Sequence, residues 1–168
     1  MSEIIPIVDK NDKVIEYRER KLTTKKDIYR VAALWLINSK NQILLSQRGM
    51  KKSHSPGKWG PATAGTVGMG ETYLENIIKE TKEEIGINLQ EYNFKKVDKI
   101  FTDVEWKYFC QWYFLKADIP LEKFAFPKDE VEQLRWADRK EFEKDLQEHP
   151  ENYTTSMAKR YEMFKKYF

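Results

Sequence analysis

A glycine-rich loop that runs into a two-faced helix, over residues 65–87, constrains the fold of this chain most strongly. Three glutamates, Glu80, Glu83 and Glu84, follow the spacing i, i+3, i+4, so a helix turning about 100° per residue places them on one face. Roughly a quarter turn away, a second face carries the side chains expected to pack on a core: Leu74, Ile77, Ile78, Thr81 and Ile85. We therefore expect a helix over residues 72–85 whose acidic row borders the buried side.

A bound cation explains the acidic row better than solvent does. Like charges this close on a helix repel one another by roughly 0.2–0.5 kcal/mol per pair. Carboxylate oxygens suit hard divalent cations, Mg²⁺ or Mn²⁺. Gly65, Gly68 and Gly70 allow the preceding loop to approach a ligand, and Gly86 stands where a helix commonly ends in the left-handed conformation. A solvated Glu/Lys face is the alternative, and the glycines together with the full spacing favour the metal site.

The same segment resembles the Nudix box, G-x5-E-x7-R-E-U-x-E-E-x-G-U, in which U is a bulky apolar residue. The positions in register are Gly65, Glu71, Glu80, Glu83, Glu84, Gly86 and Ile87. Two positions depart from the pattern, because Lys79 replaces the arginine and Thr81 replaces the first U. The resemblance implies an α/β fold, the Nudix-type α/β/α sandwich with a mixed β-sheet. It also implies metal-dependent hydrolysis of a nucleoside diphosphate linked to another moiety, by water attack on phosphorus.

The resemblance further implies a role for each matching residue. Glu80, Glu83 and Glu84 are the implied catalytic residues and metal ligands, with Mg²⁺ as the expected cofactor and Mn²⁺ as the alternative. Which of the three is the general base stays open. Lys79 is the fourth implied catalytic residue, pairing with Glu71 or Glu80 so that the loop is held against the helix. Lysine lacks the two-pronged geometry of arginine, so we expect this departure to affect the rate more than the reaction.

Three residues are candidates for substrate binding: Arg48, Gly65 and Lys58. By the family pattern Arg48 ends a strand that faces the box loop, where a planar guanidinium suits phosphate. An ion pair of Arg48 with Glu71 or another acid is equally compatible with the sequence. Lys58 belongs to a cationic loop that would raise the local concentration of an anionic substrate, and plain solvation is the alternative for its lysines.

A carboxylate from outside the helix often completes such a site, and Glu130 is the candidate for this further metal ligand. Glu132 is the neighbouring alternative, since both glutamates flank Val131 at the start of a predicted strand. A solvated strand edge explains these two glutamates about equally well. Glu105, in the turn at residues 103–107, is a third choice.

Several other segments resemble the Nudix subgroup nearest to isopentenyl diphosphate isomerase, at residues 7–9, 14–15, 29–30, 44–48, 56–59 and 151–155. The isomerase itself is therefore an alternative. It depends on a cysteine and a metal-binding histidine just before its box, and these positions are Ala64 and Thr66 here. Alanine cannot transfer a proton and threonine is a poor metal ligand, so the hydrolase is favoured. A catalytically weak, nucleotide-binding Nudix protein is a further interpretation, because Lys79 is off-pattern.

Composition bounds the partners and the location of the chain. The net charge is only +3 with both signs interspersed, which argues against nucleic-acid binding and fits a small phosphate-bearing molecule. No segment approaches the ~20 apolar residues that span a bilayer, so we expect no membrane partner. Cys110 is the single cysteine, which excludes an internal disulfide and fits a reducing cytoplasm. We expect a monomer or a homodimer.

The 168 residues are enough for one domain with a sizeable core, and we expect a single Nudix domain over residues 1–168. It comprises an N-terminal β-hairpin (1–21), the box (65–87) and C-terminal helices (138–168). Turn residues and hydrophobic alternation predict strands at residues 3–8, 13–20, 28–37, 42–48, 94–103, 107–117 and 131–136. Besides the box helix, we predict helices at residues 139–148 and 153–167. Strands and helices mix without a βαβ repeat, which indicates a mixed sheet with helices on both faces.

Overall fold

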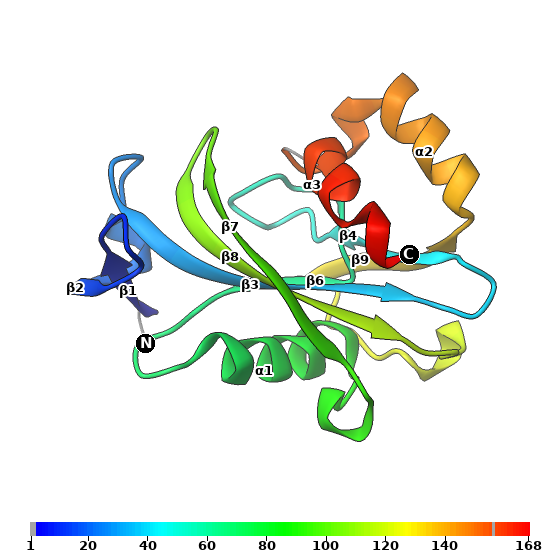
Figure 1. Ribbon diagram of the computed structural model, residues 1–168, viewed down its shortest axis with the longest axis horizontal. Helices are drawn as coiled ribbons and strands as arrows, with labels where there is room; N and C mark the ends of the chain where they lie inside the picture. The colour runs from blue at the N-terminus through cyan, green and yellow to red at the C-terminus, as the bar shows by residue number, and fades with distance from the viewer. Residues whose placement is uncertain (1–2, 156) are drawn as a thin grey trace.

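The computed structural model describes residues 3–155 and 157–168, in which nine strands form one mixed β-sheet. Helix α1 (Tyr73–Ile85) lies against one face of the sheet, and α2 (Arg139–Glu148) and α3 (Met157–Phe164) lie against the other (Figure 1). The strands are β1 (Ile4–Val8), β2 (Val14–Glu19), β3 (Ile28–Ile37), β4 (Ile43–Arg48), β5 (Trp59–Gly60), β6 (Thr63–Thr66), β7 (Lys95–Asp103), β8 (Lys107–Lys116) and β9 (Val131–Ala137). This arrangement confirms the predicted α/β/α sandwich.

Strand β3 is the axis of the sheet, because its residues 32–37 are all buried. It runs parallel to β8, in register from the pair Ile28–Lys107 to the pair Ile37–Lys116, and antiparallel to β1, β4 and β6. Since β8 occupies one edge of β3 along its full length, the three antiparallel strands share the opposite edge. A strand covered on both faces is typically a continuous apolar run, and the sequence of β3 has this form.

Along that shared edge the sheet divides. Strand β6 pairs with β3 at residues 31–34, whereas β4 pairs with it only where Ile37 meets Ile43. From there β4 continues with β5 and β9, so that β4 and β6 diverge. The divergence leaves a space through which side chains of α1 reach towards the opposite face of the sheet. This space positions the site described below.

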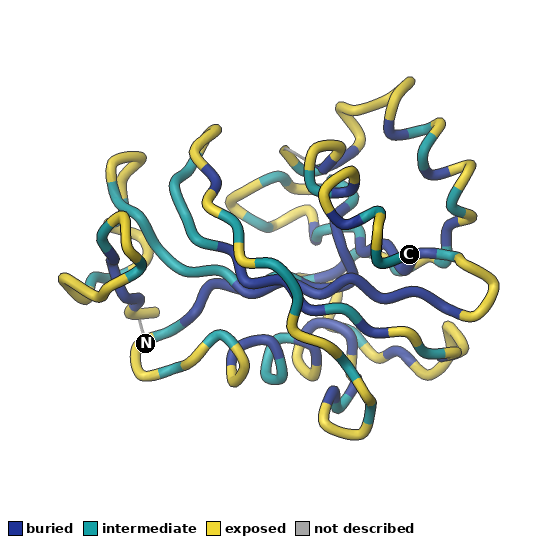
Figure 2. Tube along the Cα trace, viewed as in Figure 1, coloured by how far each residue is buried: buried dark blue, intermediate teal, exposed yellow. Residues whose placement is uncertain are grey.

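Two apolar cores join the helices to the sheet, and alternate residues of β3 supply both. Leu34 packs in a cluster with Ile77 and Ile85 of α1. Trp35, on the opposite face, packs with an aromatic cluster from β8, α2 and α3: Trp112, Phe142, Tyr161 and Phe164. Figure 2 shows this buried centre between more exposed helices and loops. Each such side chain contributes about 1.5–3 kcal/mol on burial, so packing fixes the helix layers more than intrinsic helix propensity does.

Helix α1 has the predicted position, and one of its faces differs from the prediction. Thr72 and Glu75 form a reciprocal capping box at its start, and Gly86 ends it with φ +74°. Leu74, predicted to be part of the apolar face, is exposed, and Asn76 is buried in the helix instead. The helix is turned so that part of the acidic row faces inward, because the amide of Asn76 hydrogen-bonds a backbone carbonyl of β6.

The predicted strands agree with the structure to within one residue at each end, and β5 and β6 are additional short strands. The predicted helix 153–167 is wrong at its start, because α3 begins at Met157 and a 3₁₀ turn follows it at residues 165–167. Tyr153 instead forms a bridge with Trp59, and the Thr154 amide donates to the Trp59 carbonyl at 2.8 Å. Residues 1, 2 and 156 of the predicted elements and domain lie outside the described residues.

Candidate active site

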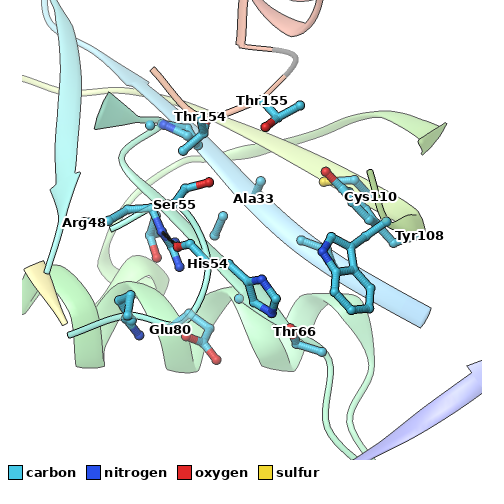
Figure 3. A pocket seen from close by; sticks show the side chains of 18 of the residues that line it. Ala33, Arg48, His54, Ser55, Thr66, Glu80, Tyr108, Cys110, Thr154 and Thr155 are labelled. Atoms are coloured by element: carbon cyan, nitrogen blue, oxygen red, sulfur yellow. Dashed lines mark hydrogen bonds between the residues drawn. The ribbon is translucent and has the colours of Figure 1, made fainter. Parts of the chain in front are cut away.

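A cavity of about 310 Å³ lies where β4 and β6 separate. Its floor is formed by side chains on the α3 side of β3 and β8, including Ala33, Cys110 and Trp112. Its walls are the loop at residues 52–55, the turn of the β7–β8 hairpin at residues 104–106 and the segment before α3 (Figure 3). Burial raises the pKa of the Cys110 thiol, so this cysteine is an inert part of the floor rather than a nucleophile.

Two glutamates of α1, Glu80 and Glu84, enter the cavity beside β6. Glu84 is buried, and its carboxylate accepts hydrogen bonds from the Thr63 hydroxyl at 2.5 Å and the Ala64 amide at 3.4 Å. Glu80 lies against Gly65, where a Cβ atom would come within 2.2 Å of the glutamate Cδ. The absence of a side chain at position 65 therefore leaves the room that the Glu80 carboxylate occupies.

The Glu80 carboxylate has an unfavourable electrostatic environment. Burial raises its pKa to about 7, the charge of Glu84 adds to this shift, and the charge of Lys79 opposes it. A carboxylate in this situation is stabilised by a nearby cation. The donors that converge here are carboxylate oxygens, so the residues fit a hard divalent ion such as Mg²⁺ or Mn²⁺.

Glu83, the third member of the acidic row, is exposed on α1, whereas Glu80 and Glu84 line the cavity. Across residues 3–155 and 157–168, no group of three or more His, Cys, Asp or Glu side chains is arranged to hold a metal ion. The structure thus brings two of the three predicted ligands together. For Glu83 to share an ion with them, its side chain has to adopt another rotamer, and its role stays a prediction.

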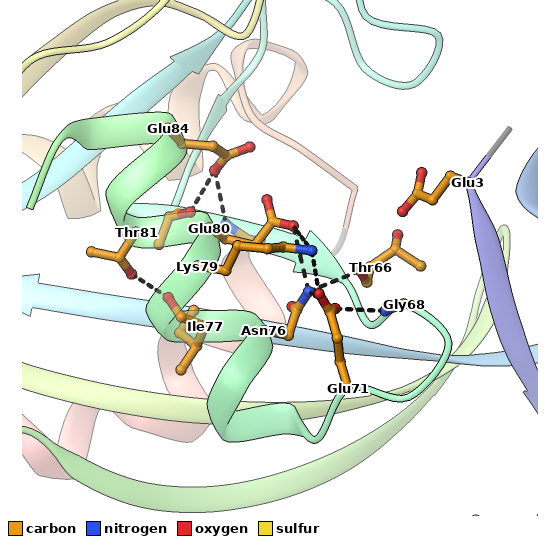
Figure 4. A network of polar contacts seen from close by, with 12 residues as sticks. Glu3, Thr66, Gly68, Glu71, Asn76, Ile77, Lys79, Glu80, Thr81 and Glu84 are labelled. Atoms are coloured by element: carbon orange, nitrogen blue, oxygen red, sulfur yellow. Dashed lines mark hydrogen bonds and ion pairs between the residues drawn. The ribbon is translucent and has the colours of Figure 1, made fainter. Parts of the chain in front are cut away.

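A network of polar contacts holds the glycine-rich loop against α1 (Figure 4). The Lys79 ammonium lies 2.5 Å from a carboxylate oxygen of Glu71 and 3.9 Å from one of Glu80. Glu71 also accepts a hydrogen bond from the Gly68 amide at 2.8 Å. Burial alone would raise the pKa of Glu71, but these hydrogen bonds and the charge of Lys79 lower it instead. Lys79, which stands where the Nudix box has arginine, therefore makes the ion pair that holds the loop against α1.

Asn76 belongs to this network and was missed by the sequence analysis. Its side-chain nitrogen donates to the Thr66 carbonyl at 3.0 Å, to Glu71 at 3.1 Å and to Glu80 at 3.4 Å. Because Asn76 is fully buried, losing these partners would leave polar groups unsatisfied. The sequence did contain an indication of this role, because Asn76 is a polar residue beside the apolar Ile77 and Ile78 and lies one helical turn before Glu80.

Arg48, a predicted substrate-binding residue, lies at the end of β4 and lines the cavity. Its Nε atom donates to the His54 carbonyl at 2.9 Å, and Glu71 is paired with Lys79 rather than with Arg48. Burial lowers the pKa of Arg48, and the charge of Glu84 opposes this shift. The hydrogen bond to His54 therefore holds the Arg48 guanidinium in place, and its positive charge interacts with the carboxylate of Glu84.

Glu130, the predicted further metal ligand, also lines the cavity, and its carboxylate is paired with the Lys52 ammonium. The Gly49 amide donates to the Glu130 carbonyl at 2.9 Å, which anchors the turn that carries this side chain. Of the two alternatives, Glu105 lines the cavity from the β7–β8 turn, and Glu132 is part of β9. The position of Glu130 is compatible with a ligand role only if its ion pair with Lys52 opens.

Lys58 is the predicted substrate-binding residue that the structure places elsewhere. Its ammonium donates to the carbonyl of Glu151, and it lines a separate hollow together with Tyr153 and Met157. The reason is that the turn before α3 brings a backbone acceptor within reach of the lysine. Lys58 therefore ties the loop at residues 49–58 to the C-terminal segment.

Comparison with known protein families matches residues 27–157 to the NUDIX domain. Nudix hydrolase 3 of Arabidopsis thaliana is 29% identical over 129 residues, which cover 69% of this chain and 16% of that protein. Isopentenyl-diphosphate Delta-isomerase of Pectobacterium atrosepticum is 32% identical over 90 residues, which cover 52% of this chain and 49% of the isomerase. The chain thus spans less than half the length of either relative. Within the described residues, no helix is long and apolar enough to cross a membrane.

Solved structures support the same fold. The crystal structure of DR0079 from Deinococcus radiodurans has a TM-score of 0.82 and 21% identity, covering 94% of this chain and 96% of that one. The NUDIX domain of Shewanella oneidensis NrtR, solved with ADP ribose, has a TM-score of 0.62 and 11% identity, covering 89% and 92%. Identities this low show the fold alone. Because the NUDIX match extends over most of its residues, however, the chain belongs to the Nudix hydrolase family, which generally uses divalent metals and nucleoside diphosphate derivatives.

Proposed function

We propose that this chain is a Mg²⁺-dependent pyrophosphohydrolase that cleaves a diphosphate bond of a nucleoside diphosphate linked to another moiety. The observation that carries the proposal is the convergence of Glu80 and Glu84 on a cavity that Arg48 also lines. Two carboxylates and a guanidinium around one space suit a diphosphate that arrives with a bound cation and retains negative charge. We further propose a cytoplasmic monomer or homodimer without nucleic-acid or membrane partners.

The residues divide the work according to their charge. Glu80, Glu83 and Glu84 would supply both the ligands of the ion and the general base, with Glu130 as the further ligand and Mn²⁺ as the alternative metal. A bound ion of this kind neutralises phosphate oxygens and lowers the pKa of a coordinated water. A box glutamate that is free of the metal accepts a proton from the attacking water.

Arg48 and the loop position the substrate in this proposal. The planar Arg48 guanidinium orients a phosphate and adds positive charge beside it. The ion pair of Lys79 with Glu71 keeps the loop from moving away from α1, so that Gly65 stays against the Glu80 carboxylate. Close positioning of this kind lowers the entropic part of the activation barrier.

Purified protein tests the proposal when it is assayed with Mg²⁺ or Mn²⁺ at mildly alkaline pH. The substrate panel contains nucleotide sugars, ADP-ribose, dinucleoside polyphosphates, NADH, CDP-alcohols and oxidised dNTPs. We expect release of phosphate-containing products from at least one of them, and loss of that release on chelation. ADP-ribose is included because it is the ligand of the NrtR domain. Metal binding measured by calorimetry, together with zero turnover across the panel, would contradict the hydrolase and favour a nucleotide-binding protein.

An isopentenyl-diphosphate isomerase activity is the second candidate, because a curated isomerase is 32% identical over 90 residues. The residues that line the cavity argue against it. Ala64 and Thr66 both border the cavity, and neither side chain can transfer a proton to carbon. Incubation of the protein with isopentenyl diphosphate in deuterated water tests this by NMR. We expect no enzyme-dependent deuterium incorporation, and any such incorporation would favour the isomerase.

A further inference from the structure

The side of the cavity formed by β8 and α3 contains buried polar atoms without partners. Among the described residues, the Nε of Arg160, the hydroxyl of Thr154 and the indole nitrogen of Trp112 are buried and make no hydrogen bond. All three residues line the cavity. Leaving a buried donor unpaired costs about 1–3 kcal/mol, and more for a charged group, so such a cluster is unfavourable until something fills it.

Arg160 is the most unusual member of this cluster, because its charge is not neutralised. Within the described residues it has no ion pair with a carboxylate, and its one hydrogen bond is donated to the Tyr108 hydroxyl. Its Cζ atom lies 5.5 Å from the centre of the Tyr108 ring. Burial lowers the pKa of Arg160 to about 10, and the guanidinium therefore stays charged at neutral pH. Nearly buried charges are normally paired, so Arg160 lacks the partner that its position calls for.

The other basic residues of the cavity lie closer to carboxylates, since Arg20 is paired with Glu3 at the start of the described chain. Lys52 is paired with Glu130, and the charge of Glu84 acts on both Lys52 and Arg48. Arg160 instead hydrogen-bonds Tyr108, whose ring lies 5.6 Å from that of Tyr29, between ring centres. Among the described residues, no ion pair or hydrogen bond joins Arg160 to Glu80 or Glu84, so an anion at Arg160 would be a group other than the diphosphate held at the box.

We propose that Arg160 and Tyr108 form a subsite for an oxyanion, a phosphate or carboxylate group of the substrate that is not attacked in the reaction. Tyr108 accepts its hydrogen bond from Arg160, so its own hydroxyl proton remains to be donated. A guanidinium and a phenol hydroxyl are thus available to one anion, and the unpartnered Thr154 hydroxyl lines the same cavity beside Gly60. A neutral group such as a nucleobase carbonyl would satisfy a donor but leave the guanidinium charge uncompensated.

This inference rests on the proposed function, because the anion bound at the subsite is taken to be part of the hydrolase substrate. It narrows the class of that substrate. The substrate is then a diphosphate compound that carries a second anionic group on the moiety beyond the scissile bond or at its free end. Thr154 and Thr155, just before α3, and Tyr108 of β8 line the same cavity (Figure 3). Charge-assisted hydrogen bonds in such a setting are about twice as strong as neutral ones.

Anion binding without divalent metal tests the subsite separately from hydrolysis. Binding of inorganic phosphate, and of acetate as a carboxylate, is measured by calorimetry in the presence of a chelator. The variants are Arg160→Met, which keeps the length but removes the charge, and Lys159→Met, which removes a neighbouring exposed charge. We expect wild type and Lys159→Met to bind phosphate alike and Arg160→Met to bind it at least about tenfold more weakly. Tighter binding of phosphate than acetate assigns the group as phosphate, and the reverse assigns a carboxylate.

The melting temperature and the Arg160→Lys variant distinguish anion binding by Arg160 from a purely structural role of this residue. If Arg160 only supports Tyr108, Arg160→Met lowers the melting temperature in anion-free buffer, whereas an unfilled subsite predicts an unchanged or higher one. Arg160→Lys, which retains a charge, is expected to retain part of the phosphate affinity. Phosphate binding that survives in Arg160→Met, or that is lost in Arg48→Gln while Arg160→Met binds normally, would overturn the proposal. Absent hydrolysis with intact, Arg160-dependent phosphate binding would contradict only the proposed function.

Discussion

On the α1 side of the cavity, the polar groups come mostly from residues 63–87, and Glu71, Lys79, Glu80 and Glu84 all have partners within that segment. Lys79 pairs with Glu71, and Asn76 hydrogen-bonds both Glu71 and Glu80. On the α3 side, the polar groups come from β3, β8, the segment before α3 and α3 itself, far apart in the sequence, and several of their atoms have no partner among the described residues. The first side is held mainly by its own contacts, with the Asn76 Oδ1 as its one buried polar side-chain atom without a hydrogen bond among the described residues, whereas the second leaves donors free for a ligand.

The difference suggests separate roles for the two sides. A side whose carboxylates already have partners holds them in place before any ligand arrives, which suits the chemical step. A side with unpaired donors gains most from contacts with a ligand, which suits recognition. Substitutions on the α1 side should therefore act mainly on kcat, and those on the α3 side mainly on KM.

The strongest test of this division is removal of the charge from the acidic row. Glu84→Gln and Glu83→Gln should each lower kcat by at least about 100-fold, roughly 2.7 kcal/mol of barrier, because glutamine keeps the shape but cannot neutralise a cation. Steady-state kinetics with Mg²⁺ measure the effect, and unchanged circular dichroism shows an intact fold. Glu122→Gln, at an exposed glutamate, is the matched control. If Glu83→Gln keeps the wild-type rate, the exposed Glu83 is not a ligand and the acidic row works through Glu80 and Glu84.

The two sides also differ in how much of them the sequence could predict. The box side was predictable because its residues follow a fixed helical spacing, and the ion pair of Lys79 with Glu71 was among the expected contacts. Sequence alone did not indicate that Asn76 rather than Leu74 is buried, since helix rotation depends on hydrogen bonds to β6. Arg160 carried no local signal, because what makes it unusual is the lack of an acidic partner from other strands.

Loop residues gave the poorest predictions for a related reason. Lys58 was expected near the substrate from the charge of its loop, and its ammonium instead bonds the carbonyl of Glu151. The contact depends on a turn 93 positions further along the chain. Local patterns fix helices and strands to within a residue or so, whereas the direction of a long side chain depends on such distant neighbours.

A second test uses the burial of Glu80 in metal-free protein. Its folded-state pKa, about 7, lies above the ordinary value of 4.5, so its contribution to stability is complete below about pH 4.5 and is lost as the pH rises through 7. We expect the free energy of unfolding to fall over this range by on the order of 2 kcal/mol more in wild type than in Glu80→Gln. Denaturant titrations with a chelator at several pH values measure it. Added Mg²⁺ should restore the stability of wild type at pH 8, and equal slopes in both proteins would contradict the prediction.

A third test asks whether the site needs glycine at position 65 because a side chain there would collide with Glu80. Gly65→Ala places a Cβ atom 2.2 Å from the Glu80 Cδ, so it should displace the carboxylate and cost about 1–2 kcal/mol, measured as a tenfold or greater loss of kcat. Gly60→Ala is the matched control, because a Cβ there meets Thr154 at an ordinary 3.5 Å. Both glycines border the cavity, so equal effects of the two substitutions would show that any added methyl group impairs the site.

The smallest expected effect concerns Lys79. Lys79→Arg should leave activity unchanged or raise it several-fold at most, about 1 kcal/mol, because arginine can make two parallel hydrogen bonds to Glu71 where lysine makes one contact at 2.5 Å. Lys79→Ala should lower activity, since Glu71 and Glu80 then lose the cation between them. Activity assays of both variants, with Lys82→Ala as an exposed control on the same helix, measure these effects.

The two Lys79 variants also decide what the lysine does. A large loss in Lys79→Arg with Lys79→Ala tolerated would show that the site requires the shorter, unbranched head group for fit rather than for charge. An unaffected Lys79→Ala would mean that Asn76 and the Gly68 amide hold Glu71 without the ion pair. In that case the α1 side would owe its rigidity to neutral hydrogen bonds, and the contrast with the charged, unpaired α3 side would become sharper.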